Sequence, residues 1–224
     1  WILQTRSGKR TAKSAVKIAV DMVKEKLILK KQAILRVDPN SLDTLLHPTL
    51  DEKSEIKVIA NGLPASPGAA SGKVVFTSEE AERLNSMMQD TILVRTETSP
   101  EDIQGMHAAK GILTARGGMT SHAAVVARGM GRPCVSGSSE ININYEKKIF
   151  KTSDLEIKEG DIITIDGSSG RIILGNVPTV KPEISGDFSK LMSWADSIRK
   201  LKVRSNSETP SDTKTARDFG AEGI

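Results

Sequence analysis

The segment of residues 116–129, R-G-G-M-T-S-H-A-A-V-V-A-R-G, has residue types and spacing that could do chemistry around one histidine, His122. Two glycines, which permit backbone conformations closed to other residues, are followed by two hydroxyl residues of the kind that caps helices. The residues after the histidine are apolar. The pattern predicts a glycine turn that leads into a buried helix, with His122 in its first turn. The residues before it are Gly117, Gly118, Thr120 and Ser121.

A histidine in the first helical turn lies beside unpaired backbone N–H groups and the positive end of the helix dipole, so an anion is favoured there. The dipole disfavours an imidazolium, and a neutral imidazole is a nucleophile. If His122 were phosphorylated, the hydroxyls of Thr120 and Ser121 would be nearby donors. Spacing alone also fits a histidine that is simply packed at a helix start. Arg128 lies two turns on, and we expect it to be a surface or domain-contact residue.

Composition excludes several other classes of protein. In 224 residues no run approaches about 18 apolar residues, which predicts a soluble chain without a membrane span. The 32 Lys and Arg only slightly outnumber the 28 Asp and Glu, and aromatics make up 3%, so nothing favours nucleic-acid binding. The one cysteine, Cys134, is expected to be a small buried residue. It fits a reducing compartment, and we expect the cytoplasm, with an organelle left open.

The other two histidines lack partners at metal-ligand spacing, so we expect no metal in the central domain. His107 is expected to pack in a helix, and His47, which precedes Pro48, to lie in a linker.

Mixed strand and helix patterns predict an α/β domain over residues 56–175. Strands are expected at 57–60, 72–76, 91–95, 111–115, 161–166 and 171–174. Helices are expected from Ser78 to Met88 with Ser78 as cap, after the run Ser99-Pro100-Glu101-Asp102, and from a cap at Thr120 or Ser121 to Gly129. Asp166 to Gly170 is expected to be a hairpin turn.

The sequence on either side of this domain predicts further helices, strands and linkers. We expect the end of a strand at 1–6, one long helix over 11–35, and a linker with local turns over 36–55. A linker and helix over 176–201, a strand over 202–206 and a helix over 211–219 follow. The chain opens on Trp1 and stops at Ile224 in mid-pattern, so we expect it to be a fragment of a larger protein.

The run G-G-M-T-S-H-A-A-V-V-A-R-G-M-G-R-P-C-V-S-G, residues 117–137, resembles the phosphohistidine signature of the phosphoenolpyruvate-utilising enzymes. Two more runs resemble the same mobile domain: G-L-P-A-S-P-G-A-A-S-G-K at 62–73 and V-R-T-E-T-S-P-E-D-I at 94–103. The resemblance therefore covers residues 56–175. It implies a swivelling β/β/α domain, flanked by helical linkers and pieces of neighbouring domains.

The same resemblance implies roles for single residues. His122 would carry the phosphoryl group, and Gly117, Gly118 and Ser121 would support the phosphate. Thr120 matches the threonine that a regulatory protein phosphorylates in plant members of the family, unless it only caps the helix.

The flanks resemble a family member that joins two further domains. Residues 1–35 resemble the end of an ATP-grasp nucleotide-binding domain, in which Gln4 and Arg6 would contact ATP phosphates and metal. Residues 202–224 resemble the start of a (β/α)8 barrel that binds pyruvate or phosphoenolpyruvate. The resemblance implies a reversible reaction of ATP, pyruvate and phosphate to AMP, phosphoenolpyruvate and diphosphate. Mg2+ and a monovalent cation would bind mainly outside this chain, and the full-length enzyme would be a homodimer.

Two alternatives remain. One is phosphoenolpyruvate synthase, which also has an ATP-grasp domain. The Gly-Met-Thr-Ser-His run and the basic G-K-R-T run at 8–11 favour instead the family member that uses ATP, pyruvate and phosphate. The other is a non-catalytic swivelling or binding module that uses its glycine-rich helix start only to hold an anion. The irregular connections on either side of the central domain, about 36–55 and 175–187, are where we expect hinges.

Overall fold

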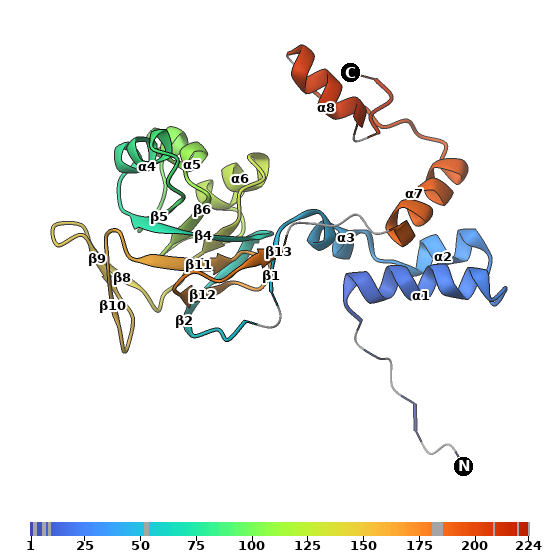
Figure 1. Ribbon diagram of the computed structural model, residues 1–224, viewed down its shortest axis with the longest axis horizontal. Helices are drawn as coiled ribbons and strands as arrows, with labels where there is room; N and C mark the ends of the chain where they lie inside the picture. Colours follow the sequence, from blue (N-terminus) through green and yellow to red (C-terminus); the bar gives the residue numbers. More distant parts are fainter. Residues whose placement is uncertain are drawn as a thin grey trace. The chain divides into compact units, whose positions relative to one another are not determined.

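The chain forms two compact units in a computed structural model (Figure 1). The described residues are 1, 4, 5, 8, 10–51, 54–180, 186–207, 209–218 and 220–223. One unit consists of Trp1–Asp38 and Ile184–Ile224, and the other is Pro39–Glu183, which contains His122. The mixed α/β class predicted from the sequence is confirmed.

The unit with His122 is built on an eight-stranded sheet in the order β2-β12-β11-β4-β5-β6-β7-β3. Strands β4 to β7 are parallel to one another, and the remaining pairs are antiparallel. The strands are β2 (Val58–Asn61), β3 (Leu63–Ser66), β4 (Ala69–Val75), β5 (Thr91–Arg95), β6 (Gly111–Thr114), β7 (Cys134–Ser136), β11 (Ile162–Asp166) and β12 (Arg171–Leu174).

Helices connect the parallel strands, because parallel neighbours need a crossover. They are α4 (Ser78–Ser86), α5 (Ile103–Ala108) with the short 3-10 helix η1 (Pro100–Asp102) before it, and α6 (His122–Gly129). Figure 1 shows α4, α5 and α6 on one side of strands β4 to β6. His122 is therefore the first residue of the last crossover helix and follows the carboxyl end of β6.

The parallel strands are buried on both faces, so they separate two apolar cores. Along β5, Ile92 and Val94 face one core and Leu93 faces the other, as the two-residue period of a strand requires. Helices α4, α5 and α6 cover the Leu93 side. The opposite core includes Phe150 and Ile157, which come from a separate three-stranded antiparallel sheet. Its strands are β8 (Asn142–Asn144), β9 (Ile149–Lys151) and β10 (Glu156–Lys158).

Two short strands bring the two ends of this unit together. Strand β1 (Thr49–Leu50) pairs antiparallel with β13 (Thr179–Val180), with Thr49 opposite Val180 and Leu50 opposite Thr179. A linker with local turns was predicted over residues 36–55, and the helix α3 (Pro39–Leu46) within it was not predicted. Pro39 is its first residue, where the missing N–H of proline costs no hydrogen bond.

The other unit contains a cluster of three helices, α1 (Ala12–Lys24), α2 (Lys30–Arg36) and α7 (Gly186–Ile198), which pack on one another. One helix over 11–35 was predicted, and this was wrong. Lys26 has φ +60°, and the N–H of Leu27 donates to the carbonyl of Met22 at 2.9 Å. A left-handed residue with this hydrogen bond is a typical helix C-terminus, so the chain turns before α2 begins.

The tail of this unit is only partly regular. The predicted helix over 211–219 is present as α8 (Pro210–Asp218). The predicted strand over 202–206 is reduced to a single bridge between Arg204 and Gly223, because a strand needs a partner along its length. At the other end of the chain, Trp1, Gln4 and Thr5 have no regular structure, whereas Ile2, Leu3 and Arg6 lie outside the described residues.

Several predicted elements of the central domain are confirmed with small shifts at their ends, including β5, β11, β12 and the hairpin turn between the last two. The helix α4 is capped by Thr77, whose hydroxyl accepts from the N–H of Glu80 at 3.3 Å, and not by Ser78. Strands β3, β7, β8, β9 and β10 were not predicted. Among the described residues, no helix has the length and apolar character needed to cross a membrane.

Cys134 lies in β7 and is fully buried, as predicted. Burial raises the pKa of its thiol to about 12. Because the thiolate is the reactive form, the folded 224-residue chain should not react with an aromatic disulfide reagent at pH 8. The released chromophore measures the reaction, and one thiol should react once denaturant is added. Rapid reaction of the folded chain would show that Cys134 is accessible.

Candidate phosphohistidine site

The turn between β6 and α6 depends on two glycines. Gly117 has φ +110° and Gly137, which follows β7, has φ +64°, both in a region that residues with a side chain rarely adopt. A Cβ on Gly137 would lie 2.3 Å from the carbonyl oxygen of Gly117, and one on Gly117 would lie 2.9 Å from the Cβ of Ser121. The two segments therefore touch through their backbones, and this contact places the start of α6 over the end of β7.

Ser121 is the N-cap of α6, as one of the two predicted alternatives. Its hydroxyl accepts from the N–H of Ala124 at 3.3 Å and lies 3.3 Å from the hydroxyl of Ser136. Ser136 is buried and lies 3.2 Å from the hydroxyl of Thr114, which donates to the carbonyl of Arg116 at 2.8 Å. A chain of hydroxyls thus connects the helix cap to the ends of β6 and β7.

Thr120 does not cap the helix. It is exposed and lies two residues before His122. Gly118 is also exposed, and a Cβ there would meet no atom within 4 Å. The carbonyl of Gly118 accepts from the N–H of Ser121 at 3.0 Å, so Gly118 contributes to the turn through its backbone, but the space around it would admit a side chain.

His122 is half-buried, and Thr98 holds its ring. The Nδ1 atom lies 2.9 Å from the hydroxyl of Thr98, and Nε2 has no hydrogen-bond partner among the described residues. Thr98 lies in the loop after β5, 24 residues earlier in the chain. No role was predicted for it, although it falls within the 94–103 run noted for its family resemblance. Only the fold shows that this loop and the start of α6 meet, because both lie at the carboxyl ends of neighbouring parallel strands.

Arg128 forms hydrogen bonds both to the glycine turn and to the helix α6 that follows it. Its Nε donates to the carbonyl of Ala124 at 3.1 Å, and its Nη2 donates to the carbonyl of Met119. The guanidinium therefore lies along α6 and holds the residue just before Thr120. The expected surface position is found, with this local contact in addition.

A buried carboxylate holds the far end of the Thr98 loop. Asp102 is 4% exposed, and its Oδ2 accepts from the N–H of Ser99 at 2.9 Å. Its Oδ1 accepts from the hydroxyl of Ser78 at 3.0 Å and lies 3.3 Å from Nε of Arg95. Ser99 is the N-cap of η1 and Pro100 follows it, as the sequence predicted. The residue after Thr98 is consequently fixed by its backbone.

The remaining candidate residues lie apart from this site. Gln4 is exposed in an irregular segment, and Arg6 lies outside the described residues. His107 is on α5, but it is exposed instead of packed. His47 is half-buried between α3 and β1. Within the part of the chain that the structure describes, no group of three His, Cys, Asp or Glu residues could hold a metal ion.

Comparison with known proteins gives a match to a domain model and similarity to longer proteins along the whole of this chain. Residues 87–170 match the family model "PEP-utilising enzyme, mobile domain". The whole chain is 60% identical to a protein of Rhizobium meliloti named "Pyruvate, phosphate dikinase", of which it covers 25%. It is 57% identical to "Pyruvate, phosphate dikinase 1, chloroplastic" of rice, of which it covers 24%. A protein of Rickettsia typhi named "Pyruvate, phosphate dikinase" is also 57% identical, with 25% covered. The chain thus spans about a quarter of the length of these relatives.

Proposed function

We propose that this chain, whose residues 87–170 match the mobile domain of PEP-utilising enzymes, is the phosphoryl-carrying part of a pyruvate, phosphate dikinase. The observation that carries the proposal is His122 at the first position of α6, with Nδ1 held by Thr98 and Nε2 without a hydrogen-bond partner among the residues that the structure describes. The names of relatives that are 57–60% identical along the whole chain support the choice of enzyme.

In the proposed reaction, Nε2 of His122 attacks the β-phosphorus of ATP and AMP leaves. The γ-phosphoryl group passes to inorganic phosphate and gives diphosphate. The phosphoryl group that remains on Nε2 then passes to pyruvate and gives phosphoenolpyruvate. Each step breaks one P–O or P–N bond and forms another, so no oxidant or reductant is needed. All steps are reversible.

Thr98 sets the ring for this attack. A neutral imidazole carries one proton, and the lone pair must lie on Nε2 for that atom to attack. In the proposed ground state the proton is therefore on Nδ1 and is donated to the Thr98 hydroxyl at 2.9 Å. Once Nε2 is phosphorylated, the same hydrogen bond continues to fix the ring plane. The backbone N–H groups at the start of α6 favour the new negative charge.

The flanking segments extend the proposal to the whole enzyme. We assign residues 1–35 to the end of the ATP-grasp domain, with Gln4 and Arg6 near the ATP phosphates, and residues 202–224 to the start of the pyruvate-binding barrel. Residues 36–55 and 176–201 then connect the central domain, 56–175, to them. His122 would visit both neighbouring sites, with hinges in these connections. The pairing of β1 with β13 supports this, since it places the two connections side by side.

Other parts of the proposal concern groups outside this chain. Mg2+ and a monovalent cation would act at the nucleotide and pyruvate sites, and the full-length enzyme would be a homodimer. We propose the cytoplasm as its compartment, with the chloroplast named for the rice relative as the alternative. Thr120, exposed and two residues before His122, is proposed as a regulatory phosphorylation site. A phosphate there would repel an incoming phosphoryl group.

Labelling of the full-length protein tests the proposed function. Incubation with ATP labelled at the β-phosphate should transfer label to His122, and the label should be lost in acid, as expected of a P–N bond. Pyruvate should then remove the label as phosphoenolpyruvate. Absence of label would favour the non-catalytic module. Label that forms without any release of diphosphate when phosphate is supplied would favour phosphoenolpyruvate synthase.

A further inference from the structure

We propose that Tyr145, in the turn between β8 and β9, is a positioning residue for His122. It would act through the loop of residues 96–99, which presents Thr98 to the imidazole ring. This inference rests on the proposed phosphoryl transfer and assigns part of its rate to a side chain from a separate sheet. Tyr145 is the only tyrosine in the sequence.

The phenol hydroxyl of Tyr145 makes two hydrogen bonds to one residue of the loop. It accepts from the backbone N–H of Thr96 at 2.7 Å and donates to the hydroxyl of Thr96 at 3.1 Å. The ring is also held, because the guanidinium of Arg95 lies 5.4 Å from its centroid and Phe76 meets it edge-on at 6.4 Å. Tyr145 is 42% exposed, but these contacts restrict its ring, and the two hydrogen bonds from its hydroxyl constrain both the position and the orientation of Thr96.

Thr96 connects this contact to both sides of the site. Its carbonyl accepts from the N–H of Arg116 at 2.8 Å, next to Gly117 in the turn that leads to α6. Thr98 follows two residues later, and Asp102 holds the next residue, Ser99, through its N–H. Thr98 therefore stands between two backbone anchors, one made by Asp102 and the other by Tyr145.

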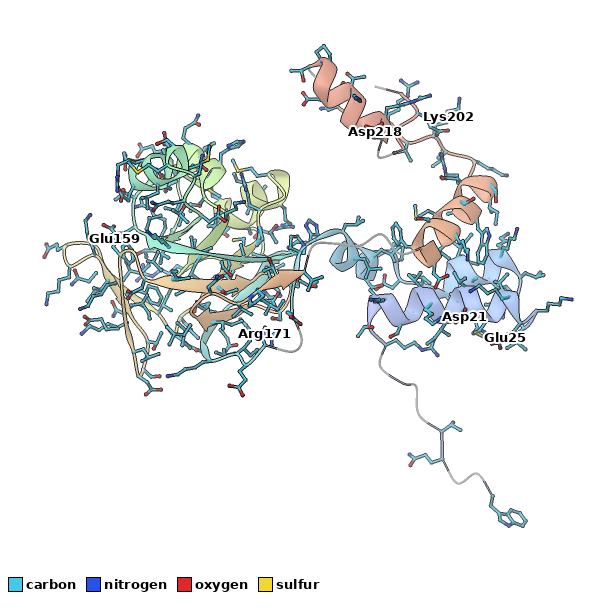
Figure 2. The ribbon with its side chains drawn as sticks, viewed as in Figure 1. Asp21, Glu25, Glu159, Arg171, Lys202 and Asp218 are labelled. Atoms are coloured by element: carbon cyan, nitrogen blue, oxygen red, sulfur yellow. The ribbon has the colours of Figure 1, made fainter. Side chains whose placement is uncertain are left out.

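The turn that carries Tyr145 is itself fixed. Lys148 has φ +51°, and its N–H donates to the carbonyl of Tyr145 at 3.2 Å. Its ammonium group forms an ion pair with Glu159 at 2.6 Å, and the N–H of Glu159 donates to the carbonyl of Lys148 at 2.9 Å. Glu159, labelled in Figure 2, comes just after β10. These contacts between Lys148 and Glu159 thus connect the turn that carries Tyr145 to the end of β10.

The test is Tyr145→Phe in the full-length protein, which removes the hydroxyl and keeps the ring. We expect phosphorylation of His122 by ATP, and transfer from phosphorylated His122 to pyruvate, to slow by the same factor, about fivefold. The KM values for ATP and pyruvate should not change, because those sites lie elsewhere. Thr152→Val is the matched control, since it removes a hydroxyl that accepts from the N–H of Leu155 in the turn between β9 and β10.

A double-mutant cycle separates positioning from a general loss of structure. Thr98→Val alone should slow both half-reactions about tenfold, and Tyr145→Phe should add little in that background because it acts through Thr98. The inference would be overturned if Tyr145→Phe slowed the half-reactions equally in the wild-type and Thr98→Val backgrounds. It would also be overturned if Tyr145→Phe left the rates unchanged or slowed them no more than Thr152→Val does. If the wild-type protein took no label at all, the proposed function itself would fail, and this outcome is distinct from the others.

Discussion

His122→Asn in the full-length protein is expected to reduce label incorporation from β-labelled ATP to less than about 1% of the wild-type level. The asparagine amide nitrogen has no lone pair available for attack, so the carrier step is lost. Both half-reactions and the overall reaction should fail together, since each uses the same atom. The affinity for ATP should be unchanged, because the proposed nucleotide site lies in another domain. Filter-bound radioactivity and nucleotide binding measure the two quantities.

His107→Asn is the matched control for this experiment. His107 is also a histidine on a crossover helix of the same sheet, but it is exposed and lies in the last turn of α5 and not at a helix start. It should retain wild-type labelling. Full labelling of His122→Asn would refute the assignment of His122 as the carrier, and loss of label in both variants would point to a general loss of structure.

Gly137→Ala is expected to lower the free energy of unfolding by about 3 kcal/mol and to remove most of the phosphorylation. A residue with a side chain at φ +64° costs about 1–2 kcal/mol. The added Cβ would also lie 2.3 Å from the Gly117 carbonyl oxygen, and overpacking of this kind adds about 1–3 kcal/mol. Relief of the clash must move the turn before α6, which holds His122. Denaturant unfolding and ATP labelling measure the two effects.

Gly131→Ala isolates the steric part of this effect. Gly131 follows α6 and has the same φ of +64°, but a Cβ there would meet no atom within 4 Å. Its substitution should lower the free energy of unfolding by only about 1 kcal/mol and leave labelling intact. Equal effects of the two variants would mean that the contact between Gly137 and Gly117 does not determine the geometry of the site.

The centre of the candidate site could be predicted from local sequence. Gly117, a capping hydroxyl and His122 at the first turn of a helix are neighbours in the chain, and their conformations follow from local rules. The buried strand β5, with Ile92 and Val94 on one face and Leu93 on the other, shows the same agreement between local pattern and structure. The proposals for the binding partners and for the carrier role still depend on the family resemblance and the comparisons.

The supports of the site could not be predicted, because they come from distant parts of the chain. Thr98 is 24 residues before His122, and Tyr145 is 49 residues after Thr96. The strands that carry these supports are also hard to recognise. Strands β8, β9 and β10 have three residues each, too few for an alternating pattern to stand out. The break between α1 and α2 depends on Lys26, a residue type with no preference for the left-handed conformation it adopts.

The antiparallel pair of β1 and β13 means that the chain enters and leaves the unit of Pro39–Glu183 at neighbouring points. A unit with adjacent ends is suited to insertion into a surface loop of another protein, where it needs no rearrangement of the host. The unit that contains His122 therefore has the arrangement of ends that an inserted domain needs. Insertion of this unit into another protein would place both junctions at the segments that lead to and from the β1–β13 pair.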